Sequence, residues 1–346
     1  MSDSSVPISL LPKPPVELLD IVGIGSPLVD VVARTDEALL ERLELPKGSM
    51  TLVDLHQAEA IYASMPASIE ISGGSAANTA VGVAALGGRA GFIGKVASDA
   101  MGDVFTHDIT AAGVDFEAAV ANGRSQGTGR CLVLVTSDAQ RTMATHLGVA
   151  NTFAPGDVDG ELLARTKITY LEGYLFDLDP AKEAMRAAIA TTHGADGAVA
   201  LSLSDSFCVE RHRKDFLALL TDQLDLLFAN EEEAKALFNV TSLAPALDAL
   251  EETGVLAVVT RGPAGCTVVT PAGRLDVAAA PTEAVVDTNG AGDLFAAGFL
   301  YGMTNALDPE QSAQLGSLCA AEVISHLGAR PQADLRELAR EAGLLD

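Results

Sequence analysis

The segment DTNGAGDLFAAGFL, residues Asp287–Leu300, joins a glycine-rich loop directly to an apolar stretch with helical character. A loop that opens into a helix gathers unpaired backbone N–H groups at the positive end of the helix dipole, and its glycines let the backbone approach a ligand closely. Asp293 falls in the first helical turn, beside this predicted anion site. Phosphoryl transfer needs both features, because donors stabilise the charge on the moving phosphoryl group and a base removes the proton of the attacking hydroxyl. The alternative interpretation is an N-capping aspartate after a glycine turn.

Upstream of this segment, short apolar stretches alternate with helical patterns. The predicted strands are Leu19–Gly23, Gly91–Gly94, Ile168–Leu171, Ala198–Leu203, Leu224–Phe228 and Val255–Thr260. The predicted helices are Ala76–Leu86, Ala100–Ala112, Pro180–Thr192, His212–Leu220, Glu231–Phe238, Leu243–Glu251, Ala291–Tyr301 and Pro309–Leu327. This alternation indicates βαβ units, so we predict an α/β fold with a doubly wound, mostly parallel sheet and helices on both faces. Cys266–Thr270 and Arg274–Ala278, separated by turn residues, predict an antiparallel meander at one edge of that sheet.

Two regions interrupt the alternation and are interpreted as insertions. Residues 31–72 mix short helical and β-prone pieces, and residues 115–146 contain strand and turn patterns. We expect the two insertions to meet in space as a small β-rich lid. The lid would belong to an α/β domain that spans residues 19–346, preceded by a loose tail over residues 1–18.

The charge balance is strongly acidic, with 22 Lys plus Arg against 47 Asp plus Glu and a net charge of −25. Such a chain is repelled by nucleic acid and by anionic membranes, so neither is expected as a partner. A phosphate ligand would have to be bound locally, by helix N-termini, backbone N–H groups and a metal ion. No apolar run reaches the roughly 18 residues of a membrane span, and the N-terminus lacks the features of a secretory signal. We therefore expect a cytoplasmic protein.

Two other kinds of site are disfavoured. The 4 cysteines are far apart and the 6 histidines show no metal-ligand spacing, which argues against a zinc site and a disulfide scaffold. Gly23 and Gly25 suggest a dinucleotide site, but the third glycine is missing and Pro27 stands where a helix should start. A dinucleotide oxidoreductase is therefore not the preferred interpretation.

The DTNGAGD string resembles the C-terminal signature of the ribokinase-like (PfkB-type) carbohydrate kinase family. Three more motifs resemble that family and occur in its order, at Gly25–Asp30 (GSPLVD), Gly73–Asn78 (GGSAAN) and Asn230–Glu233 (NEEE). Together the four motifs cover roughly residues 19–330. Each is weak alone, and their combination is highly specific.

The resemblance implies an ATP-dependent kinase of a small hydroxylated substrate, with Mg²⁺ as cofactor. It implies that Asp293 is the catalytic base and that the backbone of Gly290, Ala291 and Gly292 is the anion hole. The substrate residues that it implies are Asp30, Gly73, Gly74, Ser75 and Asn78, with Asp30 accepting hydrogen bonds from a sugar diol. The nucleotide residues that it implies are Asn230, Glu233, Thr260, Gly262, Gly265, Gly290 and Gly292. Glu233 would hold Mg²⁺ through water, and Asp287 with the carbonyl of Asn289 would frame a site for a monovalent cation such as K⁺.

Each motif also has a structural interpretation. Asp30, expected at the C-terminal end of the first parallel strand, lies where open α/β sheets bind ligands, but it could also be a solvated strand-end carboxylate. Gly73 and Gly74 could form only a turn, and the acidic run could be a helix start that favours the dipole. Gly262 and Gly265 could belong only to a hairpin turn.

Within the family, the chain looks closest to the adenosine-kinase-like branch. Ser75 and the lid arginine Arg141 match that branch, although Arg141 could be only a surface charge of the lid. Tyr174 and Phe176 could supply a stacking face for a nucleobase, and core packing is the alternative for both. Ala77 and the absence of tryptophan depart from it. A furanose or keto-sugar kinase, of the ribokinase, fructokinase or keto-deoxy-gluconate kinase type, is the alternative. A nucleotide or sugar sensor without catalysis is disfavoured by the intact acidic residues, and a homodimer through the lid edges stays open.

Overall fold

A computed structural model describes residues 17–117, 119–121, 126–138 and 140–346, so most of the predicted N-terminal tail lies outside the described residues. Its larger sheet has eight strands in the order β15-β14-β13-β12-β11-β10-β1-β5. In chain order these strands are β1 Leu19–Ile24, β5 Ala90–Ile93, β10 Thr166–Glu172, β11 Ala198–Ser202, β12 Leu226–Asn230, β13 Leu256–Thr260, β14 Cys266–Thr270 and β15 Gly273–Val277. The six neighbouring strands β5, β1, β10, β11, β12 and β13 pair in parallel. β14 and β15 add an antiparallel edge. The predicted fold class is confirmed, as is the meander.

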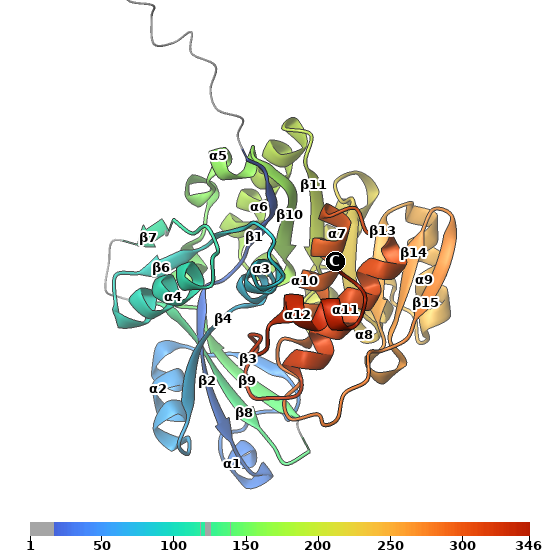
Figure 1. Ribbon diagram of the computed structural model, residues 1–346. Helices are drawn as coiled ribbons and strands as arrows, with labels where there is room; N and C mark the ends of the chain where they lie inside the picture. Colours follow the sequence, from blue (N-terminus) through green and yellow to red (C-terminus); the bar gives the residue numbers. More distant parts are fainter. Residues whose placement is uncertain (1–16, 118, 122–125, 139) are drawn as a thin grey trace, which may run out of the picture.

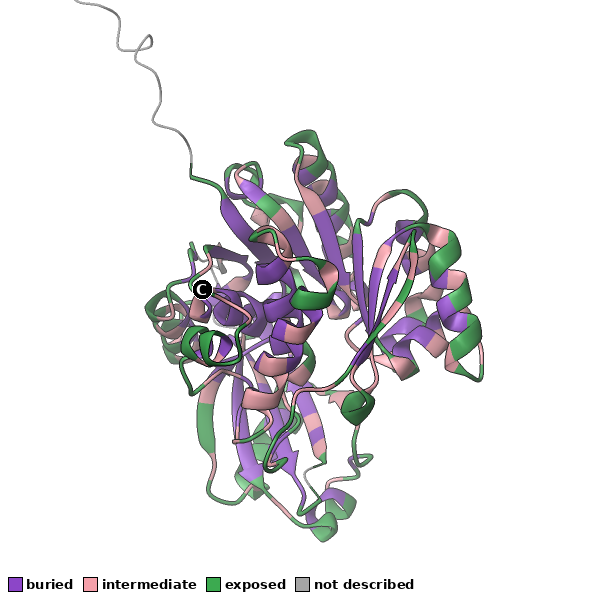
Figure 2. Ribbon diagram, turned by 45° about the vertical axis from the view of Figure 1, so that its right-hand side comes forward, coloured by how far each residue is buried: buried purple, intermediate pink, exposed green. Residues whose placement is uncertain are grey.

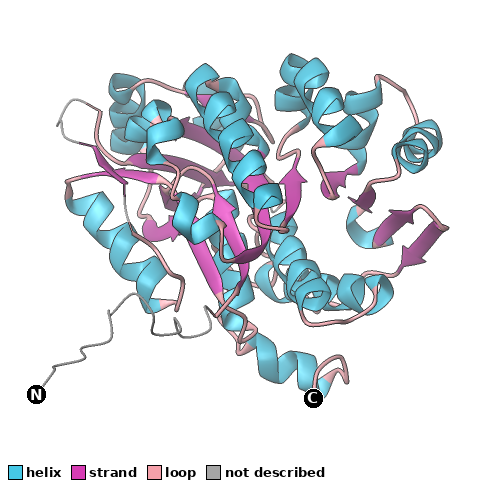
Figure 3. Ribbon diagram, turned by 90° about the horizontal axis from the view of Figure 1, so that it is seen from above, coloured by secondary structure: helices cyan, strands magenta, loops and turns pink. Residues whose placement is uncertain are grey.

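Helices cover both faces of the large sheet (Figure 3). They are α3 Ser75–Ala85, α4 Ala100–Ala111, α5 Gly160–Leu163, α6 Asp179–Gly194, α7 Ser206–Asp222, α8 Glu231–Phe238, α9 Leu243–Thr253, α10 Ala291–Thr304, α11 Pro309–Val323 and α12 Leu335–Glu341. One core joins the sheet to α3, α4, α10, α11 and α12, and a second core joins it to α5 through α9. Figure 2 shows the strands buried and the outer helices exposed. Because both faces are covered, the central strands are apolar runs rather than alternating patterns.

The helix predicted at His212–Leu220 is part of a longer element. α7 begins at Ser206, where the N-cap Asp205 accepts hydrogen bonds from the first-turn amides. His212 has non-helical backbone angles and kinks the helix. The sequence signal was therefore correct for the second half and missed the first.

A smaller five-stranded sheet, here called the small sheet, lies beside the large domain at the bottom of Figure 1. Its strands, in spatial order, are β3 Met50–Leu52, β9 Arg141–His146, β8 Gly129–Val135, β2 Leu28–Arg34 and β4 Ile69–Gly73. The helices α1 Glu37–Arg42 and α2 Leu55–Ser64 pack on one face through a separate apolar cluster. The other face contributes a second small cluster, against which Leu327 packs.

The small sheet draws on both predicted insertions, with shifted boundaries. It begins at Leu28 rather than at residue 31, and the second segment enters it only at Gly129. The earlier part of that segment contains β7 (Ala119–Ala121), which pairs with β6 (Lys95–Ala97) in a separate two-stranded sheet.

Asp30 is not at the C-terminal end of the first strand, as the sequence suggested. That strand, β1, ends at Ile24, and a turn leads the chain out of the large sheet into β2. Asp30 is the third residue of β2 and lies opposite Ile71 of β4. The prediction was wrong because Gly25–Asp30 was placed at the end of the strand Leu19–Gly23, whereas a second strand begins at Leu28 after only Gly25–Pro27.

Within the described residues, no helix combines the length and the apolar character that crossing a membrane requires.

Candidate active site

A cavity of about 380 Å³ lies between the two sheets, over the C-terminal ends of β10 to β13 and the N-termini of α3 and α10. This is the edge where open α/β sheets bind ligands. The predicted site residues that line it are Asp30, Gly74, Ser75, Asn78, Arg141, Tyr174, Asn230, Glu233, Thr260, Gly262, Asn289, Gly290, Ala291, Gly292 and Asp293. Gly73, Gly265 and Asp287 do not line it.

Asp293 lies in the first turn of α10, whose N-cap Gly290 has a left-handed backbone (φ 76°) and no side-chain cap. A side chain at Gly290 would collide with Ala329, at 2.7 Å from its Cα, so the turn requires glycine. A Cβ on Gly292 would meet no atom within 4 Å, so the helix start is open to the cavity. The amide of Ala291 donates a long hydrogen bond to the carbonyl of Thr288 at 3.4 Å, and the dipole of α10 favours negative charge at this helix start.

The Asp293 carboxylate is held by two donors from α3. Ser75 Oγ donates to Oδ1 at 2.7 Å, and Asn78 Nδ2 donates to Oδ2 at 3.0 Å. Burial raises the pKa of Asp293 above its usual range, and the bonds from Asn78 and Ser75 oppose that rise. The sequence assigned Ser75 and Asn78 to the substrate, whereas these donors contact the predicted base.

Asn78 still has an unused acceptor. Its Oδ1 is buried and has no hydrogen-bond partner among the described residues. A buried amide oxygen without a partner is costly, so this atom is available to a donor from a bound molecule.

Asp30 faces the cavity from the small sheet and is only 6% exposed. A Cβ at Gly73 would overlap its carboxylate, which explains the glycine at that position although Gly73 itself does not line the cavity. Asn289 Nδ2 donates to Asp30 Oδ2 at 3.3 Å. Burial raises the pKa of Asp30 to about 7, against the lowering effects of Asn289, Arg330 and Arg141.

Arg141 joins the small sheet to the glycine loop. Its Nη1 donates to the carbonyl of Thr288 and to Asn289 Oδ1, both at 2.9 Å. The guanidinium lines the cavity and lowers the pKa of Asp293. It therefore brings positive charge to a site that is otherwise rich in carboxylates.

Asp287 is completely buried and holds the glycine loop through hydrogen bonds, although it does not line the cavity. Its Oδ1 accepts from the amide of Asn289 at 2.9 Å, and its Oδ2 accepts from the amide of Gly328 at 3.0 Å. The carboxylate thus fixes both the glycine loop and the loop that follows α11. The monovalent cation expected at Asp287 and Asn289 stays a prediction.

Asn230 and Glu233 form a capping box at the start of α8. Asn230 Oδ1 accepts from the amide of Glu233 at 2.9 Å, and the two Glu233 oxygens accept from the amide and the side chain of Asn230 at 2.9 and 2.6 Å. Glu233 is buried, which raises its pKa to about 7. Each of its oxygens keeps lone pairs that can accept from a metal-bound water, so the donor set fits an outer-sphere role.

Glu172 is a site residue that sequence reasoning missed. It ends β10, lines the cavity, and accepts hydrogen bonds from the amides of Ser26 (3.4 Å) and Ala76 (3.1 Å). It thereby ties the turn after β1 to the start of α3, and its burial raises its pKa to about 7. A carboxylate that ends an apolar strand was the signal that could have identified it.

The two aromatic residues proposed for base stacking differ. Tyr174 lines the cavity, with its hydroxyl donating to the carbonyl of Ser204 at 3.2 Å. Phe176 points into the core, where its ring packs 4.5 Å from that of Phe216. Of the two interpretations of Phe176, stacking face or core packing, the structure shows core packing.

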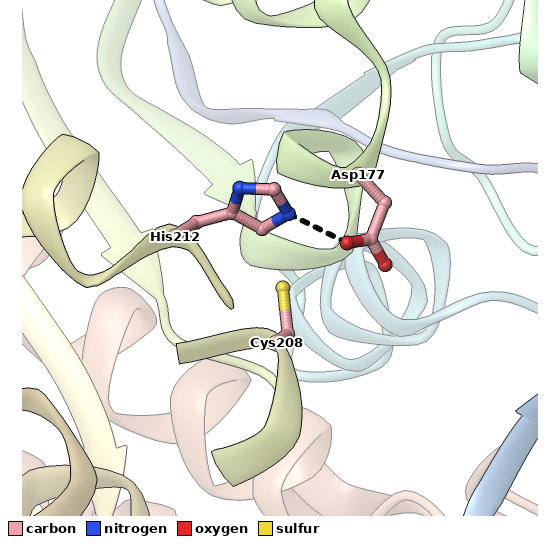
Figure 4. A group of neighbouring side chains, drawn as sticks. All are labelled: Asp177, Cys208 and His212. Carbon is pink, nitrogen blue, oxygen red and sulfur yellow. Dashed lines mark hydrogen bonds and ion pairs between the residues drawn. The ribbon is translucent and has the colours of Figure 1, made fainter. Parts of the chain in front are cut away.

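A group of potential metal ligands adjoins one end of the cavity. Asp177, Cys208 and His212 converge there, as Figure 4 shows, and Asp177 also lines the cavity. However, Arg211 holds both oxygens of Asp177, at 3.0 and 2.7 Å, and His212 Nε2 lies 2.6 Å from Oδ1. Burial raises the pKa of Cys208 to about 12, so the thiol stays protonated. We interpret the group as a set of structural contacts that hold α7 against the turn before α6.

The geometry thus combines an open helix N-terminus, a buried carboxylate held by two donors, and a second carboxylate on the facing sheet. Charge on a transferring group would be stabilised at the helix start, and a hydroxyl proton would be accepted by Asp293.

Known proteins share this architecture. The chain matches the pfkB family carbohydrate kinase domain over residues 68–335. It is 45% identical to the adenosine kinase of Sinorhizobium meliloti, with a TM-score of 0.91 over 94% of this chain and 99% of that one. A probable sugar kinase of Rhizobium etli is 40% identical, with a TM-score of 0.93 over 95% of this chain and 100% of that one. The adenosine kinase of Saccharomyces cerevisiae is 31% identical over 330 residues, which cover 89% of this chain and 95% of that one. The chain therefore belongs to the pfkB family of carbohydrate kinases.

Proposed function

We propose that this ATP-dependent kinase phosphorylates the primary hydroxyl of an adenosine-type nucleoside, with Asp293 as the general base. The observation that carries the proposal is the Asp293 carboxylate, which is buried at the uncapped start of α10 and held by Ser75 and Asn78. A base in this position accepts the hydroxyl proton while the helix start stabilises the charge on the phosphoryl group.

The substrate's sugar ring would lie between the two sheets. Asp30 and Asn78 both line the cavity and both have acceptor oxygens, and a vicinal diol supplies two donors. Gly74 lets the backbone approach the same hydroxyls. Such an arrangement would fix the ring and direct its primary hydroxyl toward Asp293.

An apolar wall favours a nucleoside over a free sugar. The small sheet and the loop after it line the cavity with Leu28, Met50, Leu52, Cys131, Met143 and Leu147. A flat nucleobase would bury this wall, whereas a monosaccharide would leave it in contact with water. Tyr174 offers a polar aromatic edge at the same cavity.

The nucleotide would lie on the other side of the glycine loop. Asn230, Glu233, Thr260 and Gly262 line that end of the cavity, with Gly265 behind them in the hairpin. Glu233 would hold Mg²⁺ through water, and the metal would supply charge neutralisation on the phosphates. The backbone of Gly290, Ala291 and Gly292 would serve as the anion hole.

We propose that the small sheet acts as a lid. Arg141 connects its strand β9 to the glycine loop, so movement of the sheet would be coupled to the anion site. A closed lid excludes water and limits wasteful ATP hydrolysis.

A furanose or keto-sugar kinase is the second candidate. The acceptors for a diol and the predicted base would serve a free sugar equally well, and the R. etli relative is described as a probable sugar kinase. The apolar wall is the feature that such a substrate would leave unused.

A coupled assay of ATP consumption distinguishes the candidates. Adenosine, other nucleosides, ribose, fructose and keto-deoxy sugars are compared at equal concentrations, with the phosphorylated product identified by mass. We expect kcat/KM for adenosine to exceed that for free sugars by about a hundredfold, because a bound nucleobase contributes several kcal/mol of apolar contact. A sugar preferred over every nucleoside would reject the nucleoside proposal and leave the family intact.

A further inference from the structure

The loop that follows α11, residues 327–333, carries a half-buried arginine toward the substrate side of the small sheet. Arg330 Nε and Nη2 are shielded from solvent and have no hydrogen-bond partner among the described residues. A buried cation without a partner is costly, so its retention calls for an electrostatic reason.

The loop is fixed on both sides of Arg330. On one side, the amide of Gly328 donates to Asp287 at 3.0 Å. On the other side, the amides of Gln332 and Ala333 both donate to Glu322 Oε1 at 2.9 Å. The backbone that presents the guanidinium is therefore held by hydrogen bonds on both sides of Arg330.

The loop lies against the part of the small sheet that carries Asp30. Leu327 packs on the apolar cluster of β2 and β8. A Cβ at Gly328 would stand 2.6 Å from Ile71 Cδ1, and Ile71 is the residue opposite Asp30 across the strand pair. Burial lowers the pKa of Arg330, and the charges of Asp108 and then of Asp30 oppose that lowering.

The surroundings of the two carboxylates are different. Asp108, on α4, accepts a hydrogen bond from Ser72 Oγ at 2.6 Å and lies beside His107, at the edge of the protein. Asp30 faces the cavity, with Asn289 and Arg141 as its other favourable neighbours and Asp293 as an unfavourable one. Arg330 therefore adds positive charge near Asp30 from a residue that is not among those lining the cavity.

We propose that Arg330 is a positioning residue of the substrate site, whose charge holds the Asp30 carboxylate in its orientation toward the cavity. The inference rests on the proposed role of Asp30 as acceptor of substrate hydroxyls. A neighbouring charge without a direct hydrogen bond suits this task, since a bidentate Arg–carboxylate pair would occupy the oxygens that the hydroxyls need. The unsatisfied N–H groups of Arg330 are then the cost of leaving Asp30 free for the substrate.

A double-mutant cycle tests the proposal. Wild type, Arg330→Met, Asp30→Asn and the double variant are compared for adenosine binding by calorimetry without ATP, and for KM and kcat. We expect Arg330→Met to weaken adenosine binding about tenfold with Asp30 present, with kcat changed much less, and to have almost no effect in the Asp30→Asn background. Arg330→Lys should restore most of the binding, because it returns the charge without the shape of the guanidinium. Arg336→Met, an exposed arginine of α12, is the matched control and should bind as wild type.

Equal losses of binding from Arg330→Met in both backgrounds would overturn the proposal, as would failure of Arg330→Lys to restore binding. The same four proteins are also unfolded with urea at pH 8, without any ligand. Arg330→Met should be more destabilising in the wild-type background than in the Asp30→Asn background, and additive effects on unfolding would equally reject the pairing. The unfolding cycle needs no substrate, so it tests the pairing of Arg330 with Asp30 even if wild-type protein does not bind adenosine. Failure of wild type to bind adenosine would count against the proposed function alone.

Discussion

Asn78 donates a hydrogen bond to Asp293 at 3.0 Å while its own buried amide oxygen has no partner in the described part of the chain. One side chain thus orients the predicted base and keeps a second polar atom without a partner. This arrangement makes both residues suitable for a direct test.

Asp293→Asn removes the base and keeps the size of the side chain. We expect turnover to fall at least about a hundredfold, because general-base catalysis contributes roughly that much, while KM for the nucleoside changes little. Steady-state kinetics measure both. Asp103→Asn, at an exposed first-turn aspartate of α4, is the control and should keep full turnover. Unchanged turnover in Asp293→Asn would remove the assignment.

Asn78→Asp exchanges the donor for a second carboxylate beside Asp293. Two carboxylates at hydrogen-bond distance cannot both ionise easily, so the pKa of Asp293, already raised by burial, should rise further. We expect the acid limb of the kcat profile to move to higher pH by about one unit or more, with activity partly recovered at pH 9. The profile is measured from pH 5 to 9. A variant with a uniformly low rate and an unmoved limb would show that Asn78 acts through shape alone.

The sequence predicted the layers of the fold because they depend on local patterns. Apolar runs separated by helical stretches and Gly or Pro turns identify βαβ units without any knowledge of their packing. The predicted residues of the glycine loop lie together at the cavity for the same reason, since loop and helix are contiguous in the chain.

Long-range relationships were beyond sequence reasoning. Asp30 was placed at the end of the first strand because only the pairing of β2 with β4 and β8 shows that it belongs to a strand of the small sheet. The donors Ser75 and Asn78 were assigned to a substrate because the approach of α3 to α10 is not encoded locally. Glu172 was missed although it ends an apolar strand, because its hydrogen-bond partners are distant in sequence, as are the carboxylates near Arg330.

Arg141→Met breaks the contact between the small sheet and the glycine loop. We expect kcat for nucleoside phosphorylation to fall about tenfold, because the anion site loses a cation and its lid contact. ATP hydrolysis without substrate should rise relative to transfer, since water enters a less closed site. Product analysis by chromatography gives the ratio. Arg130→Met, on the neighbouring strand β8 and outside the cavity lining, should leave the ratio at its wild-type value.

Glu172→Gln tests how the ionisation of Glu172 changes the free energy of unfolding. Burial raises the pKa of Glu172 from 4.5 to about 7, so the folded state binds a proton more tightly than the unfolded state. The stability that follows from this is fully present below pH 4.5 and is lost as the pH rises through about 7. Wild type should therefore lose more free energy of unfolding between pH 5 and pH 8 than the glutamine variant, by about 2 kcal/mol.

Urea unfolding at pH 5 and pH 8 measures how much free energy of unfolding each protein loses between the two pH values. Only this loss is compared, so a difference in stability between the two proteins at one pH does not affect the result. Glu210→Gln, at an exposed position of α7, should show the wild-type dependence. Activity is expected to rise as the pH rises over this range, whereas stability falls. Asp293 and Asp30 must lose their protons to accept hydrogen bonds from hydroxyls. Identical pH dependence of unfolding in wild type and Glu172→Gln would mean that Glu172 is ionised across this range. Burial of Glu172 would then not make the folded state less stable as the pH rises.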